Sequence, residues 1–286
     1  MGEAEYVRLG ARPVGLELGM RPELGHFLCR EVGLARDSVV SVVRERQALG
    51  EAPVLEYAEG DGWAIALGKD QHGRAFFEGD IAPWQMACPF RQLFSWMMDR
   101  DGAALVHAAA VDFDGGAVLF PGPSGSGKST LAALLTAAEP GRFYGDDWVP
   151  VEHRSSGWHC GQLYRSHKLS PWAAARFFGT SGRFRSGEKE VFLRGVAYWQ
   201  SAPIRALVVP SVSEEETALA FHPITPAEAA LAIGPPTVLE SPGVTPRLLG
   251  TLVKLCHDVR AFRLALGKGM LNSVSAILSD LTHASL

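Results

Sequence analysis

Residues 118–135 constrain the fold of this chain more than any other segment. An apolar run at 118–120 leads into G-P-S-G-S-G-K-S at 122–129, which fits the pattern G-x-x-x-x-G-K-[ST], and an apolar helical run follows at 131–135. A strand, a glycine-rich loop and a helix in this order form the context in which the pattern binds phosphate. A turn that fits by chance is the alternative, expected in about one per cent of chains this long.

Each position of this loop has a chemical role. Glycines let backbone N–H groups approach phosphate oxygens, and the helix that begins near residue 127 adds its positive dipole end. A lysine at the end of the pattern reaches the β- and γ-phosphates, and the following hydroxyl is a ligand for Mg²⁺. We therefore predict that ATP and Mg²⁺ bind at Gly122, Ser124, Gly125, Ser126, Gly127, Lys128, Ser129 and Thr130.

Composition excludes several functional classes. The chain has 286 residues, of which 47% are hydrophobic and 20% charged, as in an ordinary globular protein. Its net charge of −4 argues against general nucleic-acid or membrane-surface binding, and no apolar run approaches the roughly 18 residues of a membrane span. The acidic N-terminus lacks signal-peptide features, and the four cysteines are scattered. We expect a cytoplasmic protein with reduced thiols.

The first hundred residues carry no motif with assignable chemistry, and we treat 1–100 as an α+β region of unknown role. Apolar spacing predicts a helix at 22–34 and another at 90–97. Residues 62–68 and 75–77 flank a turn and predict a β-hairpin. This region is either a small module or an extension of the main sheet.

The remaining residues, 101–286, alternate between strands and helices. Two apolar runs, 104–113 and 117–120, flank an Asp-Gly turn, so the strand before the loop belongs to an antiparallel hairpin and the sheet is mixed. We predict strands at 205–210 and 259–266 and helices from Thr225 and over 245–257 and 270–281. Pro235 and Pro236 indicate a loop. The expected fold class is α/β (α+β).

Two adjacent acids, Asp146 and Asp147, follow a short strand behind the loop helix. If that strand lies beside the loop strand, both carboxylates reach the bound phosphates. One can then hold Mg²⁺ and the other can accept the proton of an attacking hydroxyl. The order of the two aspartates along the chain does not show which one holds Mg²⁺ and which one accepts the proton. A solvated turn is the alternative.

These residues together resemble the HPr kinase/phosphorylase family. The resemblance rests on His107, fifteen residues before Gly122, on the loop itself, and on an Asp-Asp pair eighteen residues after Lys128. It implies a mixed-sheet P-loop kinase core related to the nucleotide site of phosphoenolpyruvate carboxykinase, with His107, Lys128, Asp146 and Asp147 catalytic. Without the resemblance, His107 would be interpreted as a core residue.

Three departures point to the looser group of HPr-kinase-related proteins, some of which phosphorylate a peptide serine. Ala108 follows the histidine where the family usually has glycine, and Thr130 replaces a usual acid. The later Arg-Gly signature has Phe192 in place of its acid. The family forms oligomers, so a homo-oligomer is possible.

Residues 153–205 contain nine lysines and arginines against two acids. Such a concentration in an acidic chain favours a negatively charged partner, such as a triphosphate or an acidic acceptor. Residues 179–187 are rich in glycine and serine and predict a mobile loop that closes over nucleotide, with Arg183 or Arg185 stabilising the transferred phosphoryl group. A solvated basic loop is the equal alternative.

The leading hypothesis is a kinase that transfers the γ-phosphoryl group of ATP to a hydroxyl of a peptide or protein serine. A kinase acting on a small molecule, such as free serine or a sugar, is the competing form. A non-catalytic nucleotide-binding regulator remains possible. A transporter-type ATPase is disfavoured because no L-S-G-G-Q-like stretch is present.

Overall fold

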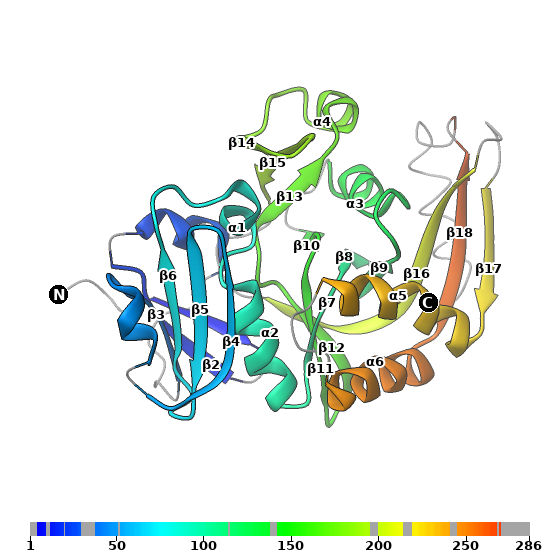
Figure 1. The fold of residues 1–286 in the computed structure, drawn as a ribbon. Helices are drawn as coiled ribbons and strands as arrows, with labels where there is room; N and C mark the ends of the chain where they lie inside the picture. The colour runs from blue at the N-terminus through cyan, green and yellow to red at the C-terminus, as the bar shows by residue number, and fades with distance from the viewer. Residues whose placement is uncertain are drawn as a thin grey trace.

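The computed structural model describes residues 5–9, 12–19, 21–29, 38–50, 52–113, 115–137, 142–194, 200–213, 219–240, 245–267 and 269. These residues form a mixed α/β structure with three β-sheets, as Figure 1 shows. None of the described helices is long and apolar enough to cross a membrane. The predicted helix at 270–281 lies outside the described residues.

The N-terminal region folds around a six-stranded sheet of order β1-β2-β3-β6-β5-β4. The predicted hairpin is confirmed, since β5 and β6 pair antiparallel with Ile65 opposite Ala75. The six strands are β1 (Glu5–Leu9), β2 (Arg12–Glu17), β3 (Ser38–Val42), β4 (Val54–Gly60), β5 (Trp63–Gly68) and β6 (Gly73–Phe77), and the short 3-10 helix η2 (Arg46–Gly50) lies between β3 and β4.

The helix predicted at 22–34 is wrong in its length. A 3-10 helix, η1 (Pro22–Phe27), ends at an extended Leu28. Leu28 forms a β-bridge with Tyr164, and the Cys29 N–H donates to the Leu163 carbonyl at 2.9 Å. These tertiary hydrogen bonds take the backbone groups that a continuing helix would need, and residues 30–34 lie outside the described part.

Helix α1 (Pro83–Ala87) and helix α2 (Arg91–Arg100) join the two parts of the molecule. The apolar stripe that predicts α2 is confirmed, because Leu93, Phe94 and Met97 are buried. The core around α2 continues past residue 100 and includes Trp148 and Tyr164. The two parts of the chain therefore share one core.

The second sheet has nine strands and is mixed, as predicted. Its central strand, β16, pairs antiparallel with β12 at its start, parallel with β9 in its middle and parallel with β18 over its second half. The strands are β7 (Ala104–Val106), β8 (Ala108–Phe113), β9 (Gly116–Pro121), β10 (Phe143–Gly145), β11 (Val149–Arg154), β12 (Gly157–Gly161), β16 (Ser201–Ser213), β17 (Leu219–Ile224) and β18 (Ala261–Gly267).

The run predicted as one strand at 104–113 is broken at His107. Its first part, β7, pairs with β11, whereas β8 pairs with both β9 and β10. The two halves thus lie near opposite ends of the strand order, and His107 is the residue that connects them along the chain. The strand before the two aspartates, β10, does not lie directly beside the loop strand, because β8 separates β10 from β9.

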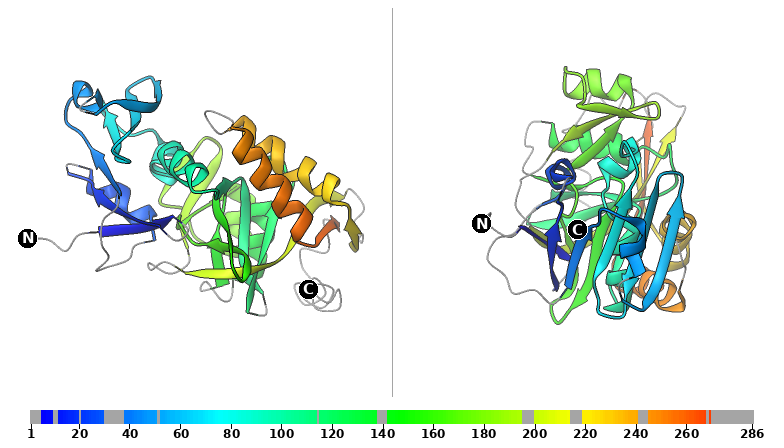
Figure 2. Two further views of the ribbon diagram at one scale, coloured as in Figure 1. Left: turned by 90° about the horizontal axis from the view of Figure 1, so that it is seen from below. Right: turned by 60° about the vertical axis from the view of Figure 1, so that its left-hand side comes forward.

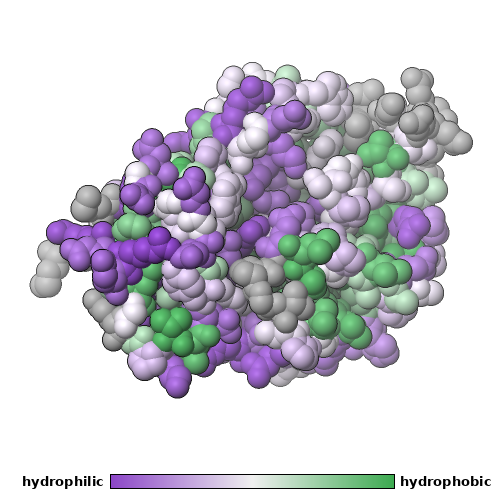
Figure 3. All heavy atoms as spheres, in the orientation of Figure 1, coloured by the Kyte–Doolittle hydropathy of each residue, from purple (hydrophilic) through white to green (hydrophobic). Residues whose placement is uncertain are grey.

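Helices cover both faces of this sheet. Helix α3 (Lys128–Thr136) buries Leu131 and Leu135 on one face. On the other face, α5 (Pro226–Leu239) and α6 (Pro246–Asp258) lie side by side, as Figure 2 shows. The predicted cap of α5 is confirmed, since Thr225 and Glu228 form a capping box. Figure 3 shows apolar patches in the region of these two helices, and Leu231, Leu239 and Val253 are exposed there beside charged residues of α6.

The loop predicted at Pro235 and Pro236 is wrong, because both prolines lie inside α5. A proline keeps a helical φ of about −65°, but it has no N–H donor and its ring meets the carbonyl oxygen four residues earlier. Gly234 stands before the first ring and has no Cβ that the ring would meet. The helix nevertheless continues to Leu239 and carries Thr237 towards the site described below.

A small third sheet of order β13-β15-β14 lies above α3 in Figure 1. It consists of β13 (Ser166–Leu169), β14 (Phe184–Ser186) and β15 (Lys189–Leu193), with helix α4 (Pro171–Phe177) between β13 and β14. The mobile loop predicted at 179–187 is thus partly a strand. Pairing of Arg185 with Glu190 and of Phe184 with Val191 fixes it to β15.

Candidate active site

The loop between β9 and α3 has a conformation that only glycine allows at key points. Gly122 has a φ of +146°, and a Cβ there would lie 2.9 Å from the Ser126 Oγ. Gly127 has a φ of +101° and begins α3 without any side-chain cap. The first N–H groups of α3 are therefore left for an anion, as the sequence predicts.

Lys128 is buried within this loop. Its Nζ donates to the carbonyl oxygens of Gly122 at 2.8 Å and Pro123 at 2.9 Å. Burial lowers the pKa of this ammonium group. An ammonium has three donors, so one remains for a phosphate oxygen. The Ser126 Oγ, also buried, has no hydrogen-bond partner among the described residues.

Asp146 lies fully buried beside the start of α3. Its Oδ1 accepts a hydrogen bond from the Ser129 Oγ at 2.8 Å, and its Oδ2 accepts one from the Lys168 N–H at 3.0 Å. The Nε2 of His167 lies 2.9 Å from the Ser129 carbonyl oxygen and must carry the proton, because a carbonyl only accepts. Burial lowers the pKa of His167, which favours a neutral ring.

Asp147 points to a different set of partners. Its Oδ2 accepts a 2.5 Å hydrogen bond from the Lys168 Nζ, and its Oδ1 lies 3.2 Å from the His107 Nε2. Burial alone would raise the pKa of Asp147, but the Lys168 ammonium and the His107 hydrogen bond outweigh it and hold the pKa well below its usual range. The group is therefore an ionised carboxylate at neutral pH.

His107 is fixed by contacts from two segments, the loop after β10 and the end of α5. Its ring stacks on Trp148 with 5.3 Å between centroids, and its backbone N–H donates to the Thr237 Oγ1 at 3.1 Å. The Nδ1 lies 3.6 Å from the Glu240 Oε1, beyond hydrogen-bond distance. His107 thus acts on Asp147 and does not reach the phosphate loop.

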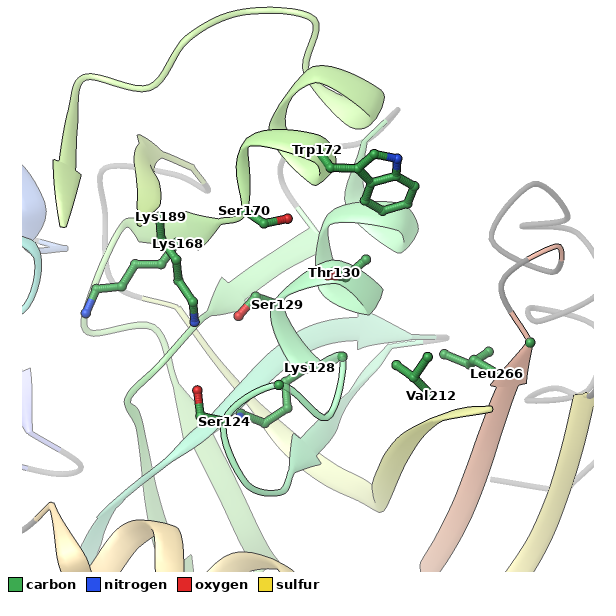
Figure 4. Close-up of a pocket in the computed structure, with 13 residues that line it drawn as sticks. Ser124, Lys128, Ser129, Thr130, Lys168, Ser170, Trp172, Lys189, Val212 and Leu266 are labelled. Atoms are coloured by element: carbon green, nitrogen blue, oxygen red, sulfur yellow. The ribbon is translucent and has the colours of Figure 1, made fainter. Parts of the chain in front are cut away.

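A cavity of about 590 Å³ opens over the phosphate loop, and Figure 4 shows its lining. One side has the loop residues with Lys168 and Lys189. The other side is apolar, with Trp172 from α4, Val212 from β16 and Leu266 from β18. A polar end beside an apolar end suits a triphosphate joined to a planar base.

The structure brings most of the predicted residues together. Ser124, Gly125, Gly127, Lys128, Ser129 and Thr130 line the cavity, and Asp146, Asp147 and His107 stand behind it. Arg183 and Arg185 are exposed and do not line this cavity. Lys168 and Lys189 lie there instead. The basic stretch at 153–205 contains both lysines, but nothing in the sequence distinguishes them from its arginines.

The donor set fits Mg²⁺ bound together with phosphates. The Ser129 hydroxyl and the Asp146 carboxylate are oxygen donors of the kind that Mg²⁺ prefers, held 2.8 Å apart. Among the described residues, no three His, Cys, Asp or Glu side chains are grouped to hold a metal. Mg²⁺ usually takes one or two protein oxygens and completes its shell with phosphates and water.

No family model matches the sequence, and no curated protein matches it. Among solved structures, the chain is similar to the HPr(Ser) kinase/phosphatase from Coxiella burnetii. The two are 11% identical, with a TM-score of 0.33, over 63% of this chain and 95% of that chain.

Proposed function

We propose that this chain is an ATP-dependent kinase that transfers the γ-phosphoryl group to a hydroxyl, in the first place a serine of a peptide or protein. The observation that carries the proposal is the hydrogen bond between the Ser129 hydroxyl and the Asp146 carboxylate. It joins the phosphate loop to an acid that directly follows β10, and Asp147 is the next residue. The serine acceptor follows from the sequence resemblance alone.

The loop and Lys128 hold the triphosphate, and the apolar end of the cavity receives the base near Trp172. Ser129 and Asp146 are the residues that would hold Mg²⁺, which neutralises charge on the phosphate oxygens when bound. Positioning and charge neutralisation supply most of the rate enhancement in phosphoryl transfer.

Asp147 is the base in this proposal. Its carboxylate is ionised, and Lys168 and His107 hold it in place. The acceptor oxygen bonds to the γ-phosphorus while the bond from that phosphorus to the bridging oxygen breaks. ADP leaves with the electron pair of that bond, and the hydroxyl proton passes to Asp147. The Ser129 contact of Asp146 and the Lys168 and His107 contacts of Asp147 support this division of roles between the two aspartates.

The test uses the purified chain, γ-labelled ATP, MgCl₂ and an extract of the source organism. We expect label in the peptide or protein fraction and its loss in Lys128→Ala, with exposed Lys69→Ala as the matched control. Asp147→Asn should slow transfer about 10²- to 10⁴-fold while ATP still binds. Asp146→Asn should instead raise the Mg²⁺ requirement about 10- to 100-fold.

Label in a small metabolite would redirect the proposal to a small-molecule kinase. Binding of ATP without ADP formation and without label in any fraction would overturn the kinase and favour a nucleotide-binding regulator.

A further inference from the structure

A second cavity, of about 430 Å³, lies beside Asp147. We propose that it binds the acceptor, and that Arg91 recognises a carboxylate next to the acceptor hydroxyl. This inference rests on the proposed function, in which Asp147 takes the hydroxyl proton. The substrate class of this cavity is a molecule that carries a hydroxyl next to a carboxylate. Such a molecule is either a serine within an acidic peptide or a free hydroxy acid such as L-serine.

The second cavity meets the first at the two lysines. Lys168 and Lys189 line both cavities, whereas Asp147 lines only the second. An acceptor in the second cavity would therefore approach the γ-phosphate across Asp147 and between two ammonium groups. Two cavities on either side of one carboxylate are the arrangement that direct transfer between two bound substrates requires.

Arg91 is held rigidly on the far wall of the second cavity. Its guanidinium lies over the Trp148 ring at 4.7 Å and over the Trp84 ring at 5.8 Å, and its side chain is 17% exposed. The Nε is buried and has no hydrogen-bond partner among the described residues. A stacked guanidinium with an unused donor is suited to a carboxylate, whose two oxygens match its planar fork.

The charges around the cavity also favour an anion. Arg91, Lys168 and Lys189 face it, with Asp147 and Glu240 as its acids. Asp147 is already paired with Lys168 at 2.5 Å. Glu240 contacts Arg91 at 3.3 Å through one oxygen, and it is 45% exposed at the end of α5. A bound carboxylate would add a partner for the terminal nitrogens of Arg91, which Glu240 contacts only through Nη1.

This assignment gives the first hundred residues a role. Trp84 lies on α1 and Arg91 begins α2, so the N-terminal region supplies one wall of the acceptor cavity. The phosphate loop and the aspartates come from the second part of the chain. Acceptor choice and phosphoryl chemistry would therefore reside in different parts of the sequence.

The test compares acceptors that differ only in charge. One arm uses L-serine and L-serinamide, and the other uses capped peptides with Glu-Ser-Glu or Gln-Ser-Gln. Binding of fluorescent peptides is measured by anisotropy, binding of the small compounds by calorimetry, and transfer from γ-labelled ATP in both arms. The variants are Arg91→Met, the charge-conserving Arg91→Lys, and Arg100→Met as a control at the exposed end of the same helix.

We expect the carboxylate member of one arm to bind at least tenfold more tightly than its neutral partner. Arg91→Met should abolish that preference, Arg91→Lys should retain part of it, and Arg100→Met should leave it unchanged. The arm that shows the preference identifies a peptide or a small acceptor. If the wild type bound the charged and the neutral member equally in both arms, the proposal would be overturned. Selective binding without phosphoryl transfer would uphold the anionic site and refute the kinase.

Discussion

At the scale of single residues, the two neighbouring aspartates differ because of one backbone angle. Asp147 has a φ of +72°, a left-handed conformation that Asn and Asp tolerate better than most residues. This turn sends Asp146 towards Ser129 and Asp147 towards Lys168. Asparagine is therefore the substitution that removes the charge of Asp147 and keeps its backbone.

The depressed pKa of Asp147 predicts how stability depends on pH. A carboxylate whose pKa is lower in the folded than in the unfolded state stabilises the fold above its unfolded pKa, which is about 4. This contribution is lost as pH falls below about 4 towards the depressed folded pKa. Asp147→Asn leaves Lys168 without its partner, and we expect a loss of the order of 3 kcal/mol at pH 7.

Urea unfolding of the wild type and Asp147→Asn between pH 7 and pH 2.5 tests this prediction. The difference in unfolding free energy should stay constant down to about pH 4 and narrow below it. Exposed Asp80→Asn is the control. A difference that widens on acidification would contradict the ion pair.

At the scale of elements, α5 is anchored to the site by one hydroxyl. Thr237 is fully buried, and its Oγ1 accepts the His107 N–H. Thr237→Val keeps the shape but leaves that N–H without an acceptor, which should cost about 1–3 kcal/mol of unfolding free energy. Thr237→Ser retains the hydroxyl and should lose less. Equal losses in denaturant titrations would show that the hydrogen bond does not stabilise the fold.

Helix α4 supplies the exposed ring at the apolar end of the cavity over the phosphate loop. Trp172 is 57% exposed, so Trp172→Ala should leave folding intact. Loss of a stacked ring should weaken ATP binding about 5- to 150-fold, or about 1–3 kcal/mol, while inorganic tripolyphosphate binds as before. Calorimetry with Trp172→Phe as the conservative variant measures this. If Trp172→Ala weakened the binding of ATP and of tripolyphosphate equally, the adenine base would not bind against Trp172.

The elements also show what the sequence could predict. The phosphate loop, α2, the β5–β6 hairpin and the cap of α5 depend on neighbouring residues, and the structure has them as predicted. The break at His107 and the continuation of α5 through Pro235 depend on pairing and packing with distant segments. Local spacing does not record those contacts.

Dependence on distant segments also explains which site residues could be predicted from the sequence and which were missed. Gly127 to Ser129 and the Asp146–Asp147 pair have fixed spacings, whereas Lys168, Lys189 and Glu240 reach the site only through the third sheet and the end of α5. Other charged residues of the same kind lie near them in the sequence, so no sequence pattern distinguishes these three from their neighbours.

At the scale of the whole molecule, the shared core predicts a single unfolding transition. Leu28 and Leu93 pack in one cluster with Trp148 and Tyr164, and the Tyr164 hydroxyl donates to the Pro89 carbonyl at 3.0 Å. Tryptophan fluorescence and far-UV circular dichroism should therefore give coincident urea curves. Leu28→Ala should shift both curves by about 2–5 kcal/mol. Two separated transitions would show that the sheets unfold independently.

Lys168 occupies a position that joins the two cavities. Its backbone N–H donates to Asp146 and its ammonium donates to Asp147, so one residue of β13 touches both carboxylates, to which the proposed function assigns the metal and the acceptor. A ligand that moved β13 from one side would change the site on the other. Thermodynamic linkage then requires reciprocity: the factor by which nucleotide changes acceptor affinity equals the factor by which acceptor changes nucleotide affinity. Cooperative binding of nucleotide and acceptor would thus depend on the single strand β13.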